Sequence, residues 1–459
     1  MFRLHKITGL LMLLLLSTIT SPILAFHPYT LSSLVEGFSG SYSERATDQH
    51  WNQLFDSSQA RQAFSISESR FGGFVVTGHT IQSNSGLGDE TVWLTRLDSE
   101  GNVEWEHLYA NGHRGWGQAV IECQNGDLAI TGVIDDEFSL VLVIRTDAEG
   151  NQLWQQVFNF TQHQEAYAIA ELPSGHLVVC GWAWHYRPTN PVDGLLICLD
   201  ESGTLLWHRE CGGLGDERFN SIAYIPSGGL ALTGLTESYG NASEQIWVVK
   251  TDLQGFVEWN ITFGGSAYDR GNSILCNYQG ELTIAGITQD IENERLDAFV
   301  VHTLYNGTQV WNRTLGLELD EMANAIIPCS EGGYAITGEI SQSKQSPWHD
   351  LLVIRLSDDG EVLWQKTYGE EGNDIGVSLV ECMEGDIVLA GMTSSFGFLS
   401  GTAWLARIPN APPPPIDPRL VNTPVALFGL VLALLVLGLA LSVYLVSRRK
   451  YYQQIRACT

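Results

Sequence analysis

The chain has 459 residues and a formal net charge of −28 at neutral pH, with 52 acidic and 24 basic side chains. This excess of negative charge excludes a sequence-independent nucleic-acid binder, which needs a basic surface to neutralise phosphates. The hydrophobic content of 44%, with 14 tryptophans, also excludes a low-complexity disordered chain.

The first 25 residues have the pattern of a signal peptide. Arg3 and Lys6 form a basic start, an apolar run extends to Leu16, and small and polar residues lead to Ala25. This order of segments directs export. We expect cleavage after Ala25, with an uncleaved signal anchor as the alternative, followed by a lead-in segment at residues 26–49.

Residues 50–408 contain a repeat that is marked by tryptophan. Successive markers are 49 to 54 residues apart, and glycines follow each marker after 21 and after 27 residues. The seven markers are Trp51, Trp105, Trp154, Trp207, Trp259, Trp311 and Trp364. A period near 50 residues, with short apolar runs and glycine turns, predicts a β-propeller with one four-stranded blade per repeat.

The repeat at residues 219–263 illustrates the four expected strands, named A to D from the centre outwards. Strand A spans 219–225, strand B 228–236, strand C 246–252 and strand D 256–263. The small residue Ser221 on strand A suits the crowded centre of the ring. The glycine before strand B permits a tight turn with positive φ, and we expect the marker tryptophan on strand D to pack between blades.

The two ends of the array predict how the ring closes. No A, B or C strand precedes Trp51 in the chain, and the last repeat ends after a C strand at residues 402–408. The segment around Trp51 therefore supplies the outermost strand of blade seven, which removes exposed sheet edges. The fold class predicted is all-β, a seven-bladed propeller, with one C-terminal transmembrane helix.

Length changes between repeats fall in the loops between strands B and C. In propellers these loops share one face, here called the upper face, with the D–A connections, and loops on a rigid scaffold often carry function. Four D–A connections place an acidic residue ten positions after the marker tryptophan: Glu217, Asp269, Glu321 and Asp374. These candidate ligand-binding carboxylates either form a partial ring that binds a cation or repels anions, or cap turns and bond the N–H groups of neighbouring backbone.

Aromatic residues without repeat counterparts are the other candidate ligand-binding residues. Trp184 and Tyr186 lie in the B–C loop of blade three and Trp348 in that of blade six. Exposed aromatics stack on sugars or anchor protein partners, with local packing as the alternative, whereas Trp182 is expected to be core. The chain contains none of the sequence motifs of hydrolases, P-loop enzymes or zinc proteases, so we predict no catalytic residues, metal site or cofactor.

Sequons and cysteines fit an exported domain without a disulfide framework. The glycosylation candidates are Asn159, Asn241, Asn260, Asn306 and Asn312. Three of the seven cysteines before the apolar C-terminal segment occupy one repeat position in different blades, too far apart for bridges. We therefore expect mostly buried free thiols.

The C-terminal segments predict a membrane anchor. Residues 409–423 are rich in proline and should form an extended stalk. Residues 424–446 carry no charge, and their length exceeds the roughly 20 residues that span a bilayer. Arg448, Arg449 and Lys450 follow, so residues 447–459 form a short cytoplasmic tail and the propeller lies outside the cell membrane.

Units such as GGLALTGLT at residues 228–236 and DLLVIRLSDDGEVLWQKTYGE at 350–370 resemble the tandem repeats of prokaryotic exported propellers. They are broadly similar to quinoprotein-like (PQQ-like) repeats over residues 50–408. In those repeats an Asp-x-x-x-Gly motif usually precedes the tryptophan, whereas here Asp252 and Gly255 are one residue closer, which argues against a quinone cofactor. The resemblance therefore implies the fold and little about activity.

These observations predict a membrane-anchored surface propeller that acts as a non-enzymatic binding, adhesion or scaffold module through its upper face. The expected partner is an envelope protein or a glycan. The alternative is an exported enzyme that acts on envelope or environmental glycans with the carboxylates of the upper rim, since glycoside hydrolysis requires a pair of carboxyl groups.

Overall fold

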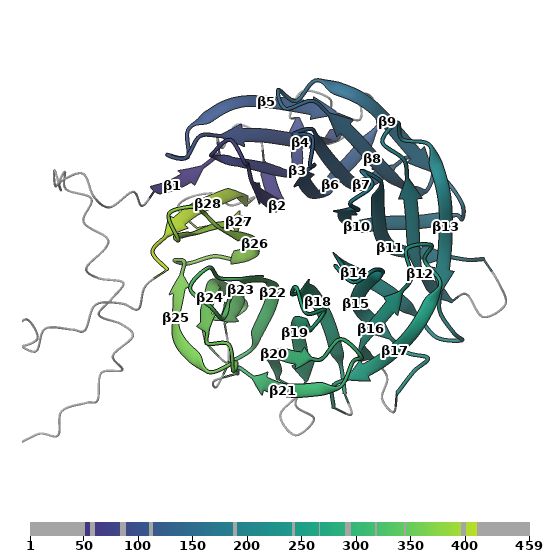
Figure 1. Ribbon diagram of the computed structural model, residues 1–459. Helices are drawn as coiled ribbons and strands as arrows, with labels where there is room; N and C mark the ends of the chain where they lie inside the picture. Colours follow the sequence, from purple (N-terminus) through teal and green to yellow (C-terminus); the bar gives the residue numbers. More distant parts are fainter. Residues whose placement is uncertain are drawn as a thin grey trace, which may run out of the picture. The chain divides into compact units, whose positions relative to one another are not determined.

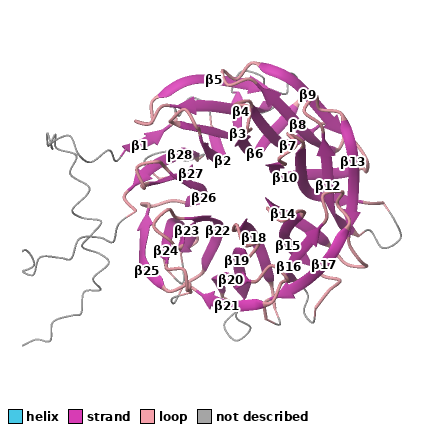
Figure 2. Ribbon diagram, in the orientation of Figure 1, coloured by secondary structure: helices cyan, strands magenta, loops and turns pink. Residues whose placement is uncertain are grey.

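The computed structural model describes residues 51–55, 60–82, 89–109, 113–186, 191–240, 244–265, 267–289, 295–316, 319–343, 346–395 and 401–410. These residues form seven four-stranded antiparallel sheets arranged as blades around a central opening (Figure 1). Strands are the only regular secondary structure among them (Figure 2). The predicted seven-bladed propeller is confirmed.

The predicted signal peptide, lead-in segment, transmembrane segment 424–446 and tail all lie outside the described residues, as does the stalk beyond residue 410. Within the ranges given above, no helix has the length and apolar character needed to cross a membrane. The membrane anchor therefore stays a prediction.

Each blade runs outwards from strand A to strand D. The A strands are β2 (Arg61–Glu68), β6 (Arg114–Glu122), β10 (His163–Glu171), β14 (Glu217–Tyr224), β18 (Asp269–Cys276), β22 (Glu321–Pro328) and β26 (Asp374–Glu381). The B strands are β3 (Phe74–Gln82), β7 (Leu128–Asp135), β11 (Leu177–Trp184), β15 (Leu230–Thr236), β19 (Leu282–Gln289), β23 (Tyr334–Ser341) and β27 (Ile387–Thr393).

The outer half of each blade consists of strands C and D. The C strands are β4 (Asp89–Leu97), β8 (Ser139–Thr146), β12 (Val192–Leu199), β16 (Gln245–Thr251), β20 (Leu296–Thr303), β24 (His349–Leu356) and β28 (Thr402–Ile408). The D strands are β5 (Val103–Tyr109), β9 (Gln152–Phe158), β13 (Leu205–Cys211), β17 (Val257–Phe263), β21 (Gln309–Thr314), β25 (Val362–Tyr368) and β1 (Trp51–Leu54).

Blade seven joins the two ends of the array, as predicted. Its strand order is β1-β28-β27-β26, and Trp51 pairs with Arg407 across the β1–β28 ladder. The Thr402 hydroxyl also donates to the Phe55 carbonyl at 2.7 Å. This pairing covers the outer edge of β28, which would otherwise expose unpaired backbone groups.

Six of the seven marker tryptophans pack on a glycine of the following blade. Trp51 lies against Gly101 in the C–D turn of blade one, where an added Cβ would come within 2.6 Å of the indole ring. The Trp51 Nε1–H also donates to the Ser99 carbonyl at 3.1 Å. Gly101 has a φ of +82°, so both the turn and the close approach require glycine. The predicted position of the tryptophans between blades is confirmed.

The small residues of strand A form a second, inner seam. The Ser65 hydroxyl accepts a hydrogen bond from the Val120 N–H of the next blade at 3.2 Å. The Ser378 hydroxyl accepts one from Ile66 N–H at 3.3 Å, which joins blade seven to blade one. A hydroxyl at this position therefore satisfies a backbone N–H that the inner strands cannot pair.

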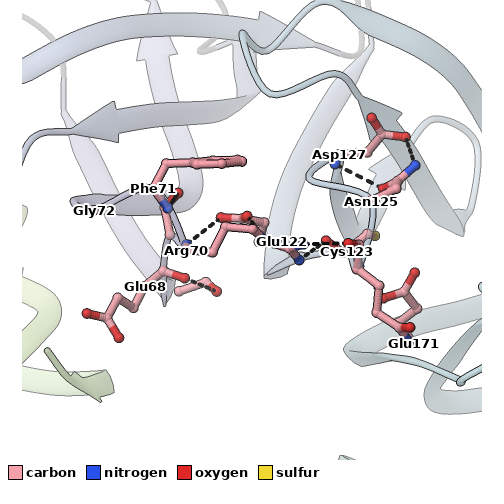
Figure 3. A network of polar contacts seen from close by, with 12 residues as sticks. Glu68, Arg70, Phe71, Gly72, Glu122, Cys123, Asn125, Asp127 and Glu171 are labelled. Carbon is pink, nitrogen blue, oxygen red and sulfur yellow. Dashed lines mark hydrogen bonds and ion pairs between the residues drawn. The ribbon is translucent and has the colours of Figure 1, made fainter. Parts of the chain in front are cut away.

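The A–B turns on the face opposite the upper face are also tied across blades (Figure 3). The Arg70 guanidinium lies 2.6 Å from Glu122 in the next blade and donates to the Cys123 carbonyl. One blade further, Gln124 N–H donates to the Glu171 carboxylate at 2.7 Å. Polar side chains on this face therefore link one blade to the next.

The core agrees with the sequence analysis in two further respects. Trp93, Trp247 and Trp404 on the C strands are buried. The seven described cysteines are all free, and burial raises the pKa of Cys211 and Cys276 to about 11. These thiols are protonated at neutral pH and act as small apolar core residues.

Replacing Trp51 with alanine tests ring closure. We expect Trp51→Ala to lower the free energy of unfolding by about 3 kcal/mol, because it removes both a large side chain and a hydrogen bond at the closing seam. The measurement is the guanidinium chloride concentration at which half of the full chain is unfolded. Leu214→Ala serves as the control, since Leu214 is 86% exposed. Equal midpoints for the two variants would contradict this role of Trp51.

Candidate functional site

The four repeat carboxylates are buried at the first position of their A strands. Glu217, Asp269, Glu321 and Asp374 are each at most 1% exposed. They begin strands β14, β18, β22 and β26 in blades four to seven. The structure therefore places them beneath the D–A connections.

Glu217 shows what these carboxylates contact. Its oxygens accept hydrogen bonds from Gly213 N–H at 2.6 Å, Ser238 N–H at 2.9 Å and the Thr236 hydroxyl at 2.8 Å. Asp374 likewise accepts from Glu370 N–H at 3.2 Å and the Ser395 hydroxyl at 2.6 Å. Glu217 and Asp374 thus each join a D–A connection to the end of strand B, as the turn-bonding alternative predicts.

Asp269 has the same arrangement and an elevated pKa. It accepts from Gly265 N–H at 2.8 Å and from the Thr288 hydroxyl. Desolvation by burial raises its pKa, and these hydrogen bonds offset only part of that effect.

Replacing Glu217 with alanine separates a structural role from a ligand-binding role. We expect Glu217→Ala to lower the free energy of unfolding by about 3 kcal/mol, because it leaves buried N–H and O–H donors without an acceptor. Thermal and denaturant unfolding of the full chain measure this, with exposed Glu237→Ala as the control. An unchanged stability would contradict the assignment of Glu217 to the turn.

The candidate aromatic residues lie in two separate places. Trp184 and Tyr186 make an edge contact in blade three, with ring centroids 6.2 Å apart, and Tyr186 is 79% exposed. Trp348 is 45% exposed and belongs to blade six. With blades four and five between them, the structure brings Trp184 and Tyr186 together and leaves Trp348 apart.

A cavity of about 310 Å³ lies in the central channel. Every A strand carries a β-bulge, and all seven bulge residues line this cavity: Phe64, Gln118, Tyr167, Asn220, Asn272, Asn324 and Val377. Leu235, Arg218 and Arg270 complete the wall. Bulges commonly redirect side chains at functional sites. None of these residues was among the candidates expected from the sequence, although the variable position just before the small residue of strand A was a usable signal.

Arg218 and Arg270, the channel arginines, give part of this wall a positive charge. Arg218 lies over the Trp182 ring at 5.2 Å and forms no ion pair with any described carboxylate. Arg270 lies over the Tyr268 ring at 5.1 Å, and its Nη2 is 3.9 Å from the Glu244 carboxylate. Burial raises the pKa of Glu244, and Arg270 opposes this shift.

Trp182, which the sequence left as a candidate core residue, contacts two residues of this wall, Tyr167 and Arg218. It is half-buried and pairs with Glu165 on the neighbouring A strand. Its Nε1–H donates to the Tyr167 hydroxyl at 3.1 Å, and that hydroxyl donates to Glu165 at 2.9 Å. Burial raises the pKa of Tyr167 to about 12. At this register the ring contacts Arg218 of the next blade, beside the channel.

Three asparagines line the cavity on β14 and β18, the strands of the channel arginines, and on the neighbouring β22. The side-chain amides of Asn220, Asn272 and Asn324 each donate to a backbone carbonyl of the next blade at 2.9 Å. Because these Nδ2 groups are held by the seam, the three amides present their carbonyl oxygens as acceptors for a ligand.

The structure also brings together His185, Asp193 and Glu210 in blade three. Their ligand atoms lie within 4.8 Å of one another. The histidine spacing along the chain did not suggest a metal site, because the three residues come from different strands.

Four of the five sequon asparagines are described, and all four are exposed: Asn159, Asn260, Asn306 and Asn312. Asn241 lies outside the described residues. Glycosylation of these positions stays a prediction.

Comparison with known proteins finds similarity of fold alone. No protein-family model and no curated protein sequence matches the chain. The Neurospora crassa Pan2 WD40 domain matches at 9% identity and a TM-score of 0.46, covering 78% of this chain and 98% of that one. Sqt1 from Chaetomium thermophilum matches at 10% identity and a TM-score of 0.43, covering 79% and 100%.

An extracellular domain from B. thetaiotaomicron matches at 15% identity and a TM-score of 0.43, covering 75% of this chain and 40% of that one. These distant neighbours do not bear on the prokaryotic origin or the similarity to quinoprotein-like repeats, which stay predictions.

Proposed function

We propose that this protein is a surface-anchored binding module that holds a carboxylate-bearing sugar residue of a glycan in the central channel. The propeller fold suits a binding or scaffold module. The observation that carries the proposal is the pair of channel arginines in a chain of net charge −28. Arg218 in particular forms no ion pair within the described residues, although the more distant Glu244 interacts with its charge, so a ligand carboxylate would supply a direct partner.

The remaining wall of the cavity supports a sugar acid over a simple inorganic anion. Guanidinium groups donate to a carboxylate, while the amide oxygens of Asn220, Asn272 and Asn324 accept hydrogen bonds from hydroxyl groups. Phe64, Leu235 and Val377 provide apolar surface for the C–H groups of a pyranose ring. A volume of 310 Å³ is at the lower end of small-molecule sites, about 300–1,000 Å³.

The upper face provides the place for further contact with an envelope glycan or protein. Arg218 and Arg270 are the second residues of β14 and β18, next to the D–A connections. Exposed Tyr186 and Trp348 lie in B–C loops of the same face. We assign the primary recognition to the channel arginines, because the carboxylates Glu217, Asp269 and Asp374 already bond their own connections.

Binding of D-glucuronate, with D-glucose as the uncharged comparison, tests this proposal. We expect calorimetry on the full chain in detergent to show binding of glucuronate and no binding of glucose. Arg218→Ala and Arg270→Ala should each weaken binding about tenfold or more, since a charge-assisted hydrogen bond contributes about 1.5–3 kcal/mol. Glu244→Gln should strengthen binding, because it removes the carboxylate that competes for Arg270.

The matched control is Arg313→Ala. Arg313 lies on outer strand β21, pairs with Glu361 at 2.8 Å and is remote from the cavity lining. Its loss should leave glucuronate binding unchanged. Equal affinity for glucose and glucuronate, or full binding by Arg218→Ala, would refute the assignment.

Anchoring by residues 424–446 is a separate part of the proposal and has its own test. We expect the full chain to stay in the membrane pellet after an alkaline carbonate wash, because an uncharged segment of this length partitions into the bilayer. A variant that ends at residue 423 should be released into the soluble fraction. Release of the full chain by the same wash would contradict the anchor.

A further inference from the structure

Three side chains with metal-binding groups converge at one end of blade three. His185 follows the last residue of β11, Asp193 is the second residue of β12, and Glu210 is next to the last residue of β13. The His185 Nε2 atom lies 2.8 Å from a Glu210 oxygen and 3.7 Å from an Asp193 oxygen. We call these residues the blade-three triad.

His185 and Asp193 are partly shielded from solvent, whereas Glu210 is an exposed residue. The side chains of His185, Asp193 and Glu210 are 15%, 12% and 25% exposed. Two carboxylates that share one small space repel each other, and a cation placed among them relieves this repulsion. The backbone also fixes the spacing, since Cys211, the neighbour of Glu210, pairs with Gly194, the neighbour of Asp193.

The other repeats show that the propeller itself does not need this combination. Glu210 lies three residues after its marker tryptophan, and the other six repeats have uncharged side chains there: Leu54, Leu108, Val157, Thr262, Thr314 and Thr367. A glutamate at this position is therefore specific to blade three.

Blade six shows how the scaffold satisfies the other two positions without a metal. Gln342 and Asp350 are the repeat counterparts of His185 and Asp193. The Gln342 side-chain amide donates to Asp350 at 2.7 Å. Blade three replaces this amide with an imidazole and adds a second carboxylate. Blade three thus has a histidine–carboxylate hydrogen bond in place of the amide one, and all three of its groups are ones that coordinate metal ions.

We propose that the blade-three triad binds one divalent transition-metal ion, with Zn²⁺ as the best match. One imidazole nitrogen and two carboxylate oxygens form a mixed ligand set that suits Zn²⁺ better than Ca²⁺ or Mg²⁺, which prefer oxygen alone. The ion joins the B–C loop that carries Trp184 and Tyr186 to strands β12 and β13.

Three protein ligands leave at least one coordination position of Zn²⁺ for a water molecule or a ligand oxygen. Tyr186 follows His185 directly and is 79% exposed, so the aromatic surface and the open coordination position lie on the same loop. This site is independent of the channel arginines, and its failure would leave the proposed function intact.

The test is titration of the full chain with Zn²⁺ in detergent, in the presence of excess Mg²⁺ to occupy diffuse acidic sites. We expect about one tightly bound Zn²⁺ per chain and a higher unfolding temperature, which a chelator reverses. Ca²⁺ should not substitute for Zn²⁺. Absence of a stoichiometric, chelator-sensitive Zn²⁺ in the folded chain would overturn the proposal.

The repeats supply variants that preserve the fold. His185→Gln introduces the residue of blade six, and Glu210→Thr the residue of blades four to six. Each should weaken Zn²⁺ binding by more than about tenfold, the lower limit for losing even an outer partner of a metal ligand. Their unfolding temperatures without Zn²⁺ should match that of the parent chain.

His349→Gln is the matched control. His349 lies 2.9 Å from Glu339 in blade six and forms a histidine–carboxylate pair without a third ligand among the described residues. We expect Zn²⁺ binding by this variant to equal that of the parent chain. If His185→Gln and Glu210→Thr also bind as the parent does, the bound ion lies elsewhere and the proposal is wrong.

Discussion

The contact between six of the seven D-strand tryptophans and a glycine of the next blade is the constraint on which the ring depends. Trp51 on Gly101 and Trp207 on Gly255 show the same arrangement in different parts of the ring. An indole ring reaches the C–D turn only where no Cβ intervenes, and that turn also requires a positive φ. The turn glycine therefore always stands four residues before the tryptophan of its own repeat, and length variation is confined to the B–C loops.

The inner seam determines which residues are free to vary in the channel. Ser65 and Ser378 accept hydrogen bonds from the backbone of the following blade, and the crowded centre of the ring requires a small residue at their position. The bulge residue just before it faces the channel instead and carries no such requirement. Chemical differences between blades therefore accumulate there, as at Tyr167 and Asn220, and above them at Arg218.

Polar groups on the upper face divide into those that hold the scaffold and those that do not. Glu217 and Asp374 are buried and bond their own turns, so their negative charge is part of the architecture. Arg218 and Glu210 have counterparts of different chemistry in other blades, and the fold of those blades is the same. Packing does not explain residues that depart from the repeat in this way, so they are the best candidates for a functional role.

The amino-acid sequence by itself determined the number of blades, the four strands of each and the closure of blade seven by the segment at Trp51, because a periodic pattern reports local structure that recurs. It left the roles of Glu217 and Trp182 open, since neither burial nor contacts with the next blade follow from spacing alone. Only the tertiary structure brought Arg218 next to Arg270, and His185 next to Glu210. Contacts between adjacent blades and across antiparallel strands depend on ring geometry and hairpin register, which join residues that lie 25 to 52 positions apart in the chain.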